Sequence, residues 1–211
     1  MIAAADQLLI SGGPLLVVLA GGTGAVTAAG KVFAATMLVR APAFLFQGFA
    51  AALLPSLTTL EAVGDSARFR RSVSAVAAVL AAFSAACAAC ALLAGPAAMK
   101  LLYGPGFDAA PGDLALLALG IGGYLAASTF SQAALARAAA GRAAAIWTVA
   151  AVAFVGVELS LGGAPLHRVS VAFAAGTAIS ALLLFALVIR RPHPLRAPTT
   201  LEPVGATQVS A

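Results

Sequence analysis

The chain contains very little charge. Only 9% of its 211 residues are Asp, Glu, Lys or Arg, whereas a soluble globular domain carries about 25%. Hydrophobic residues make up 62% of the chain and the mean hydropathy is +1.04. A bilayer accepts such a composition, because a helix of about 20 apolar residues spans the hydrocarbon with every backbone hydrogen bond satisfied internally. We therefore predict an all-α, polytopic membrane protein.

Residue types that carry catalysis or bind metals are also scarce. The two histidines, His167 and His193, have no metal-ligand spacing to another ligand. Cys87 and Cys90 form a Cys-x-x-Cys pair inside the apolar run AAFSAACAACALLAG, without the βαβ pattern of a redox motif, so we interpret them as small residues in a helix contact. The glycine-rich segment 21–24 lacks the strand and acidic partner of a nucleotide-binding fingerprint. We expect no enzymatic activity, no cofactor and no metal.

Positive charge exceeds negative charge by five, but it is not concentrated in one stretch. The twelve Lys and Arg residues are scattered singly or in short groups between apolar runs. Phosphate binding along a nucleic acid requires a clustered basic stripe, so we expect no nucleic-acid partner. These residues instead serve as signals for membrane topology.

Six apolar runs are long enough to predict six transmembrane helices within residues 1–190. The first contains Pro14 and is expected to be kinked, and the Gly- and Pro-rich segment between the third and fourth is expected to interrupt the helix. The polar, Pro-rich tail 191–211 is expected to be disordered and cytoplasmic. The predicted spans are about 7–22, 31–57, 72–93, 114–136, 143–161 and 169–189.

The positions of Lys and Arg in the loops predict an orientation, since positive residues are retained on the cytoplasmic side. With both termini in the cytoplasm, three basic residues fall outside, namely Lys31, Lys100 and Arg168. Eight fall inside: Arg68, Arg70, Arg71, Arg137, Arg142, Arg190, Arg191 and Arg196. We therefore expect a multi-pass membrane protein with both ends cytoplasmic.

Arg40 is the remaining basic residue and lies within a predicted span. At 1.5 Å per residue it is about 13 Å deep, near the midplane of a hydrocarbon core of roughly 30 Å. A charge at that depth costs roughly 2.5 to 3.5 kcal/mol, so it normally faces protein or water. Pro42, two residues later, removes a backbone donor and is expected to kink the helix, either to expose carbonyl groups to a cavity or to fit neighbouring helices.

Polar side chains form stripes on three of the predicted helices. One interpretation is a shared hydrated cavity in which Arg40 attracts an anionic head group through charge-assisted hydrogen bonds. The alternative is that the uncharged polar residues form hydrogen bonds between helices, a role that needs no substrate. The candidate cavity residues are Arg40, Gln47, Thr36, Tyr124, Ser128, Gln132 and Gln7, with Ser11 and Ser131 on the same stripes.

Three further charged residues lie near predicted helix ends. Asp6 is expected near the cytoplasmic rim beside Arg71 or Arg137, as a solvated end residue. Glu158 and Arg168 are expected at the outer interface, also solvated. No acidic residue is predicted deep within a span.

The order of several segments resembles the second half of polysaccharide flippases of the multidrug/oligosaccharidyl-lipid/polysaccharide exporter superfamily. The segments are FAATMLVRAPAFLFQGFAAALLPSLTTLEAVGD, FRRSV, GPAAMKLLYGPGF and QAALARAAAGRAA, which cover about residues 30–145. The most specific parts are LLPSL at the end of a long span and LLYGPGF near the outer end of the next helix pair. The resemblance implies six helices forming one lobe of a two-lobe transporter that moves a lipid-linked saccharide across the membrane.

The first lobe of that family has no counterpart in this sequence. The resemblance therefore implies a partner, which would be a second six-helix lobe from the same gene, from a separate chain or from a second copy. The expected partners are this lobe, membrane lipids and a lipid-linked saccharide. A multidrug or small-molecule exporter lobe and a non-transporting scaffold of a glycan-synthesis complex remain alternative functions.

Overall fold

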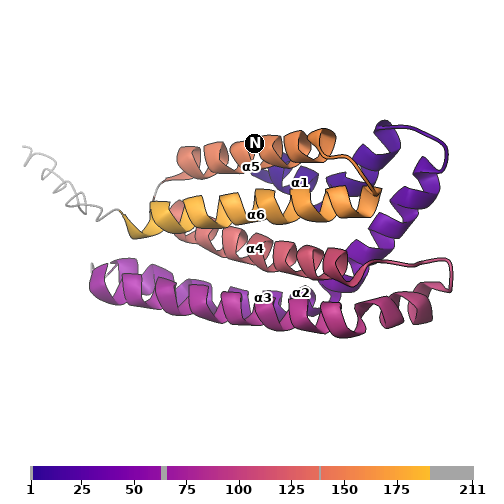
Figure 1. The fold of residues 1–211 in the computed structure, drawn as a ribbon. Coiled ribbons are helices and arrows are strands. Elements are labelled where there is room, and N and C mark those ends of the chain that lie inside the picture. The colour runs from indigo at the N-terminus through magenta and orange to yellow at the C-terminus, as the bar shows by residue number, and fades with distance from the viewer. Residues whose placement is uncertain (1, 63–65, 138, 191–211) are drawn as a thin grey trace, which may run out of the picture.

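The computed structural model is built from six helices and describes residues 2–62, 66–137 and 139–190, except that the side chains of 45–62, 66 and 136 are not described. The helices are α1 (Ile2–Leu19), α2 (Ala25–Ala62), α3 (Ser66–Tyr103), α4 (Pro111–Ala136), α5 (Ala140–Ser160) and α6 (Pro165–Ile189). Most of them lie along one common direction, while α2 descends obliquely from the α1–α2 loop (Figure 1). The predicted tail lies outside the described residues.

The length and composition of the helices support a membrane location. Among the described residues, α1, α3, α4, α5 and α6 are each long and apolar enough to cross a bilayer. Large apolar side chains are exposed along them, including Leu93, Leu101 and Leu182 at 84%, 85% and 68%. Such surface is compatible with hydrocarbon and costly in water. The predicted all-α, multi-pass membrane bundle is confirmed.

The central helix of the bundle is α4. It packs against α2, α3, α5 and α6, whereas α1 packs against α2, α5 and α6. The contact between α4 and α6 depends on a small residue, because a Cβ on Gly120 would lie 2.4 Å from Cδ1 of Phe173 in α6. Close approach through glycine is typical of packing between membrane helices.

The ends of the helices follow local backbone rules. The α1–α2 loop contains Gly21, Gly22 and Gly24, whose φ angles of 73°, 104° and 87° fall in the left-handed region that glycine adopts without steric cost. The segment 21–24 is therefore a tight reversal between two helices. Pro111 and Pro165 begin α4 and α6, where the missing N–H would have had no helical partner.

The α3 helix continues well beyond its predicted end. The Gly- and Pro-rich segment after the third predicted span does interrupt the helix, but later than the end of that span near residue 93, because α3 runs unbroken through Gly95 and Pro96 to Tyr103. A proline inside a membrane helix is tolerated when the surroundings compensate for the lost bond. Gly95 here packs closely on α4, since a Cβ on it would lie 2.7 Å from Cδ1 of Leu114. The break falls at Gly104, whose φ is 98°.

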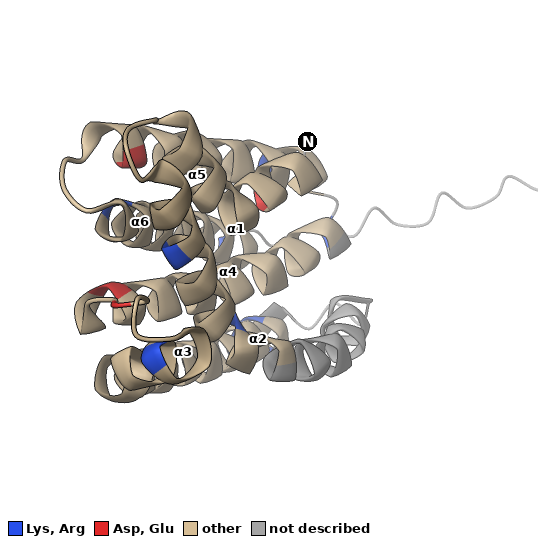
Figure 2. Ribbon diagram, turned by 90° about the vertical axis from the view of Figure 1, so that its right-hand side faces the viewer, with Lys and Arg blue, Asp and Glu red and all other residues tan. Residues whose placement is uncertain are grey.

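Charged residues are sparse and lie mostly toward the ends of the helices (Figure 2). The start of α3, the short α4–α5 connection and the end of α6 lie at one end of the bundle, which we call the arginine end; its described basic residues are Arg68, Arg70, Arg71, Arg137, Arg142 and Arg190. The opposite end, which we call the acidic end, carries Asp108, Asp113 and Glu158 together with Lys31, Lys100 and Arg168.

Candidate functional site

A polar cluster surrounds Tyr124 at the middle of α4. Tyr124 lies about 18 to 20 Å from either end of this helix at 1.5 Å per residue. Its hydroxyl lies close to the Asp6 carboxyl group of α1 and to the Ser128 hydroxyl one turn along α4. We call Asp6, Arg40, Tyr124 and Ser128 the midspan cluster, and it joins α1, α2 and α4.

Arg40 supplies the positive charge of the midspan cluster. It is half-buried on α2 and close enough to interact electrostatically with Tyr124. Its guanidinium carbon also lies 6.0 Å from the centroid of the Phe44 ring one turn further along. A cation over an aromatic face gains about 0.5 to 1 kcal/mol at an exposed site, which is less than the cost of holding it at mid-depth.

The α5 helix holds Tyr124 in position from the opposite side. The Trp147 side chain is 1% exposed and meets the Tyr124 ring edge to face, with centroids 6.0 Å apart and an interplanar angle of 70°. Its indole N–H donates a hydrogen bond of 2.6 Å to the Ser131 hydroxyl. This fixed indole therefore restricts the position of the Tyr124 ring.

The midspan cluster is not sealed inside the bundle. Asp6, Arg40, Tyr124 and Ser128 are all partly exposed. In a bilayer this surface lies at the depth where a charge facing hydrocarbon costs most, so a charged, partly exposed group requires water or another protein beside it. The cluster can therefore contribute both a cation and an anion to a ligand at the middle of the membrane.

The other described candidates are not joined to this cluster by a hydrogen bond or an ion pair. Thr36 is buried, and its hydroxyl donates to the Val32 carbonyl of its own helix at 2.8 Å, as expected of a packing residue. Gln7 and Gln132 are exposed. The side chain of Gln47 lies outside the described residues. The structure thus brings together Arg40, Tyr124 and Ser128 of the seven candidates, with Asp6 in addition.

The expected position of Asp6 is wrong. It does not lie beside Arg71 or Arg137 at the arginine end, because its carboxyl group contacts Tyr124 about 20 Å away from that end along α4. The sequence pattern does not indicate which helices pack against α1. It therefore could not predict the depth of Asp6 relative to α4. The informative signal was an acid within an apolar run, which is costly unless it is paired.

Glu158, near the acidic end, is also placed differently from its prediction. It was expected to be solvated, but it is 0% exposed. An Oε of Glu158 lies 3.9 Å from an Nη of Arg168, too long for a hydrogen bond, and both Glu158 oxygens and the Arg168 Nε lack hydrogen-bond partners. The neighbouring His167 pairs instead with Asp113, its Nδ1 lying 2.7 Å from Oδ1.

A third charge pair at the acidic end is fully exposed to solvent. Lys100 Nζ lies 2.9 Å from Asp108 Oδ1. The hydrogen bond and positive charge of Lys100, with a smaller contribution from the charge of Lys31, lower the pKa of Asp108 below its ordinary value of 3.8. This pair joins the end of α3 to the α3–α4 loop.

The two cysteines lie on a different surface from these charges. Both are free, with Cys87 half-buried and Cys90 exposed. They line an apolar cavity of about 350 Å³ between α2, α3 and α4, together with Pro42. No charged side chain is among the residues that line this cavity.

Comparisons with known proteins give no match, whether with protein-family models, with curated protein sequences or with solved structures. The site must therefore be interpreted from its own chemistry.

Proposed function

We propose that this chain is one lobe of a membrane transporter that translocates a lipid-linked saccharide. The observation that carries the proposal is the midspan cluster, where Arg40 and Asp6 are both partly exposed near the middle of α4. A lone six-helix bundle would present these groups to lipid. A second lobe opposite them would enclose a hydrated cavity and remove that cost.

The chemistry of the cluster suits an amphipathic anion. Arg40 provides charge-assisted hydrogen bonds for a phosphate or pyrophosphate group, while Tyr124 and Ser128 provide hydroxyls that suit a saccharide. The segment order that resembles polysaccharide flippases points to the same substrate class. The excess of arginine at one end supports an inner-membrane protein with the start of α3, the α4–α5 connection and the end of α6 in the bacterial cytoplasm.

The test is complementation in cells from which the gene has been deleted. Surface polysaccharide and the pool of undelivered lipid-linked saccharide are measured for the wild-type chain, Arg40→Ala and Arg40→Lys, at equal amounts of membrane protein. We expect Arg40→Ala to lower export and Arg40→Lys to retain part of it. Arg142→Ala removes an exposed arginine at a helix end and serves as the matched control. Full export with Arg40→Ala would remove Arg40 from the mechanism.

The position of Asp6 favours a second candidate function, export of small cationic molecules by the same kind of lobe. An acidic group at mid-depth attracts a cation or a proton, and Asp6 is such a group. Asp6→Asn keeps the size of the side chain and removes its charge. For this function we expect deletion to raise sensitivity to cationic drugs, with surface polysaccharide unchanged, and Asp6→Asn to behave like the deletion.

A scaffold that does not transport makes a different prediction. Neither Arg40→Ala nor Asp6→Asn would then change export or drug sensitivity, while the chain would still co-purify with glycan-synthesis enzymes. That combination would reject both transport proposals.

A further inference from the structure

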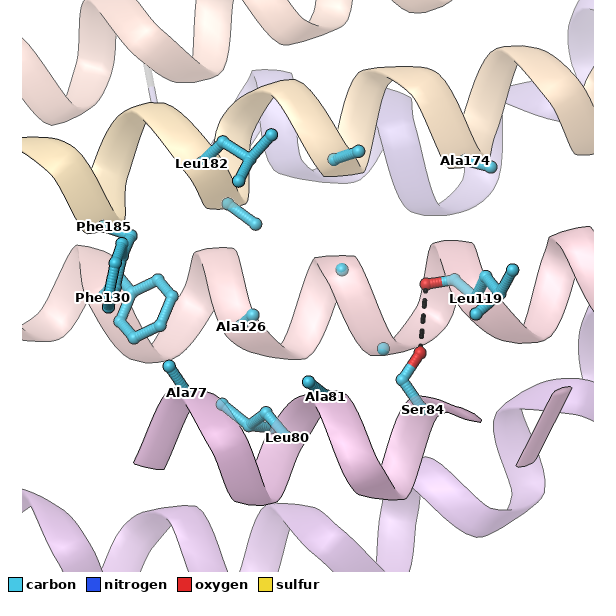
Figure 3. Close-up of a pocket in the computed structure, with 14 residues that line it drawn as sticks. Ala77, Leu80, Ala81, Ser84, Leu119, Ala126, Phe130, Ala174, Leu182 and Phe185 are labelled. Carbon is cyan, nitrogen blue, oxygen red and sulfur yellow. Dashed lines mark hydrogen bonds between the residues drawn. The ribbon is translucent and has the colours of Figure 1, made fainter. Parts of the chain in front are cut away.

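An apolar groove runs along the surface where α3 and α6 both pack against α4 (Figure 3). The floor is the stretch of α4 from Leu119 to Phe130, and the walls are residues 77–84 of α3 and 174–185 of α6. The groove exists because α3 and α6 pack extensively against α4 but make little or no contact with each other. Its volume is about 490 Å³.

The groove is large enough for a single hydrocarbon chain. At 1.5 Å per residue the floor is about 17 Å long. One extended chain fills a cross-section of only roughly 20 Å², because bonded hydrocarbon carbons need about 4 to 5 Å of width at van der Waals contact. The groove can therefore take an acyl chain along its length.

The lining of the groove offers almost nothing to a polar ligand. Ser84 is the single polar side chain among the lining residues, and its hydroxyl donates a hydrogen bond of 3.5 Å to the Leu119 carbonyl (Figure 3). The walls include Ala81 and Ala178, both exposed, whose small side chains leave the space open. Phe130 and Phe185, with ring centroids 5.3 Å apart, line the end nearer the arginines.

Positive charge gathers beyond that end of the groove. Arg137 follows α4, and its guanidinium donates to the Val188 carbonyl of α6 and lies 4.0 Å from the centroid of the Phe69 ring of α3, so it contacts both α3 and α6 beyond the groove. Arg70 precedes Ala77 by seven residues, which places it on the same face of α3, and it is exposed. The opposite end of the bundle carries as many described acidic as basic residues, including the pair of Asp108 and Lys100. An anionic head group is therefore attracted more strongly to the arginine end.

We propose that the groove binds one acyl chain of an anionic phospholipid from the leaflet at the arginine end, with the phosphate near Arg70 and Arg137. Both parts of the lipid then match their surroundings. The acyl chain lies along the apolar lining in place of bulk lipid, and the phosphate lies beside two guanidinium groups. Binding requires only the folded chain in a membrane, so it can fail or succeed independently of transport.

The test uses the purified full chain in a non-ionic detergent. Native mass spectrometry measures retention of phosphatidylglycerol and of phosphatidylcholine with identical acyl chains. The wild type should retain phosphatidylglycerol preferentially, and Arg70→Ala should reduce that preference about fivefold, as expected for one basic residue beside anionic lipid. Arg142→Ala, at the same end of the bundle but on α5, should leave the preference unchanged.

The groove itself is tested by filling it. Ala81→Leu with Ala178→Leu places two larger side chains in it from exposed positions, so the fold is retained, and retention of both lipids should fall. Ala82→Leu changes the adjacent exposed residue outside the groove and should have no effect. Equal retention of the two lipids by the wild type would overturn the proposal. So would unchanged retention in the filled variant, or a change in oligomeric mass instead of lipid binding, which would make the groove a contact between copies.

Discussion

At the scale of single residues, the charges inside the bundle differ in how they are compensated. The Asp6 carboxyl group has the Tyr124 hydroxyl beside it, whereas Glu158 has no hydrogen bond and only Arg168 as a neighbouring charge, at 3.9 Å. Removing one partner of a buried ion pair is much more costly than replacing both, because the remaining charge is left uncompensated in a medium of low polarity.

The first prediction concerns this pair. Arg168→Ala should destabilise the protein by about 3 to 5 kcal/mol, because it leaves the Glu158 carboxylate buried without a counter-charge. Glu158→Leu combined with Arg168→Met should restore much of the loss, since apolar side chains of similar volume often stabilise as well as a buried pair does. Thermal unfolding in detergent measures both variants.

Arg142→Ala is the control for that experiment, since Arg142 is exposed at the start of α5. It should change the unfolding temperature very little. If Arg168→Ala behaves like Arg142→Ala, Glu158 is compensated by something other than this arginine.

The exposed pair at the acidic end makes a prediction about pH. Because Lys100 lowers the pKa of Asp108, the pair stabilises the folded state above the ordinary pKa of 3.8, and this contribution is lost as the pH falls through the lower folded value. The wild type should therefore unfold at a slightly higher temperature than Asp108→Asn near neutral pH. That difference should vanish at acidic pH, and Lys100→Met should abolish it at every pH. If the difference in unfolding temperature persists unchanged in acid, the Lys100–Asp108 pair is not its cause.

The sequence could predict which residues are unusual but not where they meet. Arg40 was identified from its depth in an apolar run, which depends only on the chain itself. Asp6 and Glu158 were both misplaced, because their surroundings come from other helices: Tyr124 on α4 for Asp6, and Arg168 on α6 for Glu158. Local hydrophobicity contains no information about which helix faces a given side chain.

At the scale of helices, contacts between small residues set how closely α3 and α4 approach. A Cβ added to Gly122 would lie 2.0 Å from the Ser84 Oγ and 3.1 Å from the Ser84 Cα, so the two helices touch at this point. Neither a hydrophobic pattern nor a charge count indicates such a contact. Small residues are abundant throughout the chain, and only packing distinguishes those in contact from those facing lipid.

This contact gives a prediction about helix packing. Gly122→Ala should destabilise the protein by about 1 to 3 kcal/mol, because the added methyl group forces α3 away from α4. Combining it with Ser84→Gly should recover part of that loss by removing the opposing side chain. Unfolding temperatures of the two variants measure the effect.

Gly156→Ala provides a matched control on α5, where an added Cβ would meet nothing within 4 Å. Alanine is favoured over glycine in a helix by roughly 0.5 to 1 kcal/mol, so this variant should be neutral or slightly stabilised. Equal destabilisation by Gly122→Ala and Gly156→Ala would mean that the α3–α4 contact is not specific.

The existence, order and number of helices followed from the apolar runs, because each run had to cross the same hydrocarbon thickness. The residues at which the helices end were predicted less accurately. The third predicted span ends near residue 93, yet α3 continues through Gly95, which packs against Leu114, as far as Tyr103. Local breakers predict a helix end only where neighbouring helices do not support its continuation.

At the scale of the whole molecule, the distribution of charge predicts how the bundle lies in the membrane. The arginine end carries six described basic residues and the acidic end three, with three acidic residues beside them. Positive residues are retained in the cytoplasm, so the start of α3 should lie inside and the α5–α6 loop outside. This orientation also places the lipid groove with its arginine end toward the cytoplasmic leaflet.

Single cysteines test that orientation in a Cys87→Ala/Cys90→Ala background. Ala67→Cys lies exposed at the start of α3, and Gly162→Cys lies exposed in the α5–α6 loop, where an added side chain meets no other atom within 4 Å. With a membrane-impermeant maleimide and sealed right-side-out vesicles, Gly162→Cys should react at once, whereas Ala67→Cys should react only after the vesicles are opened. The reverse pattern would invert the topology and move the proposed lipid site to the outer leaflet. Reaction of both cysteines in sealed vesicles would mean that the two ends of the bundle are not separated by a bilayer.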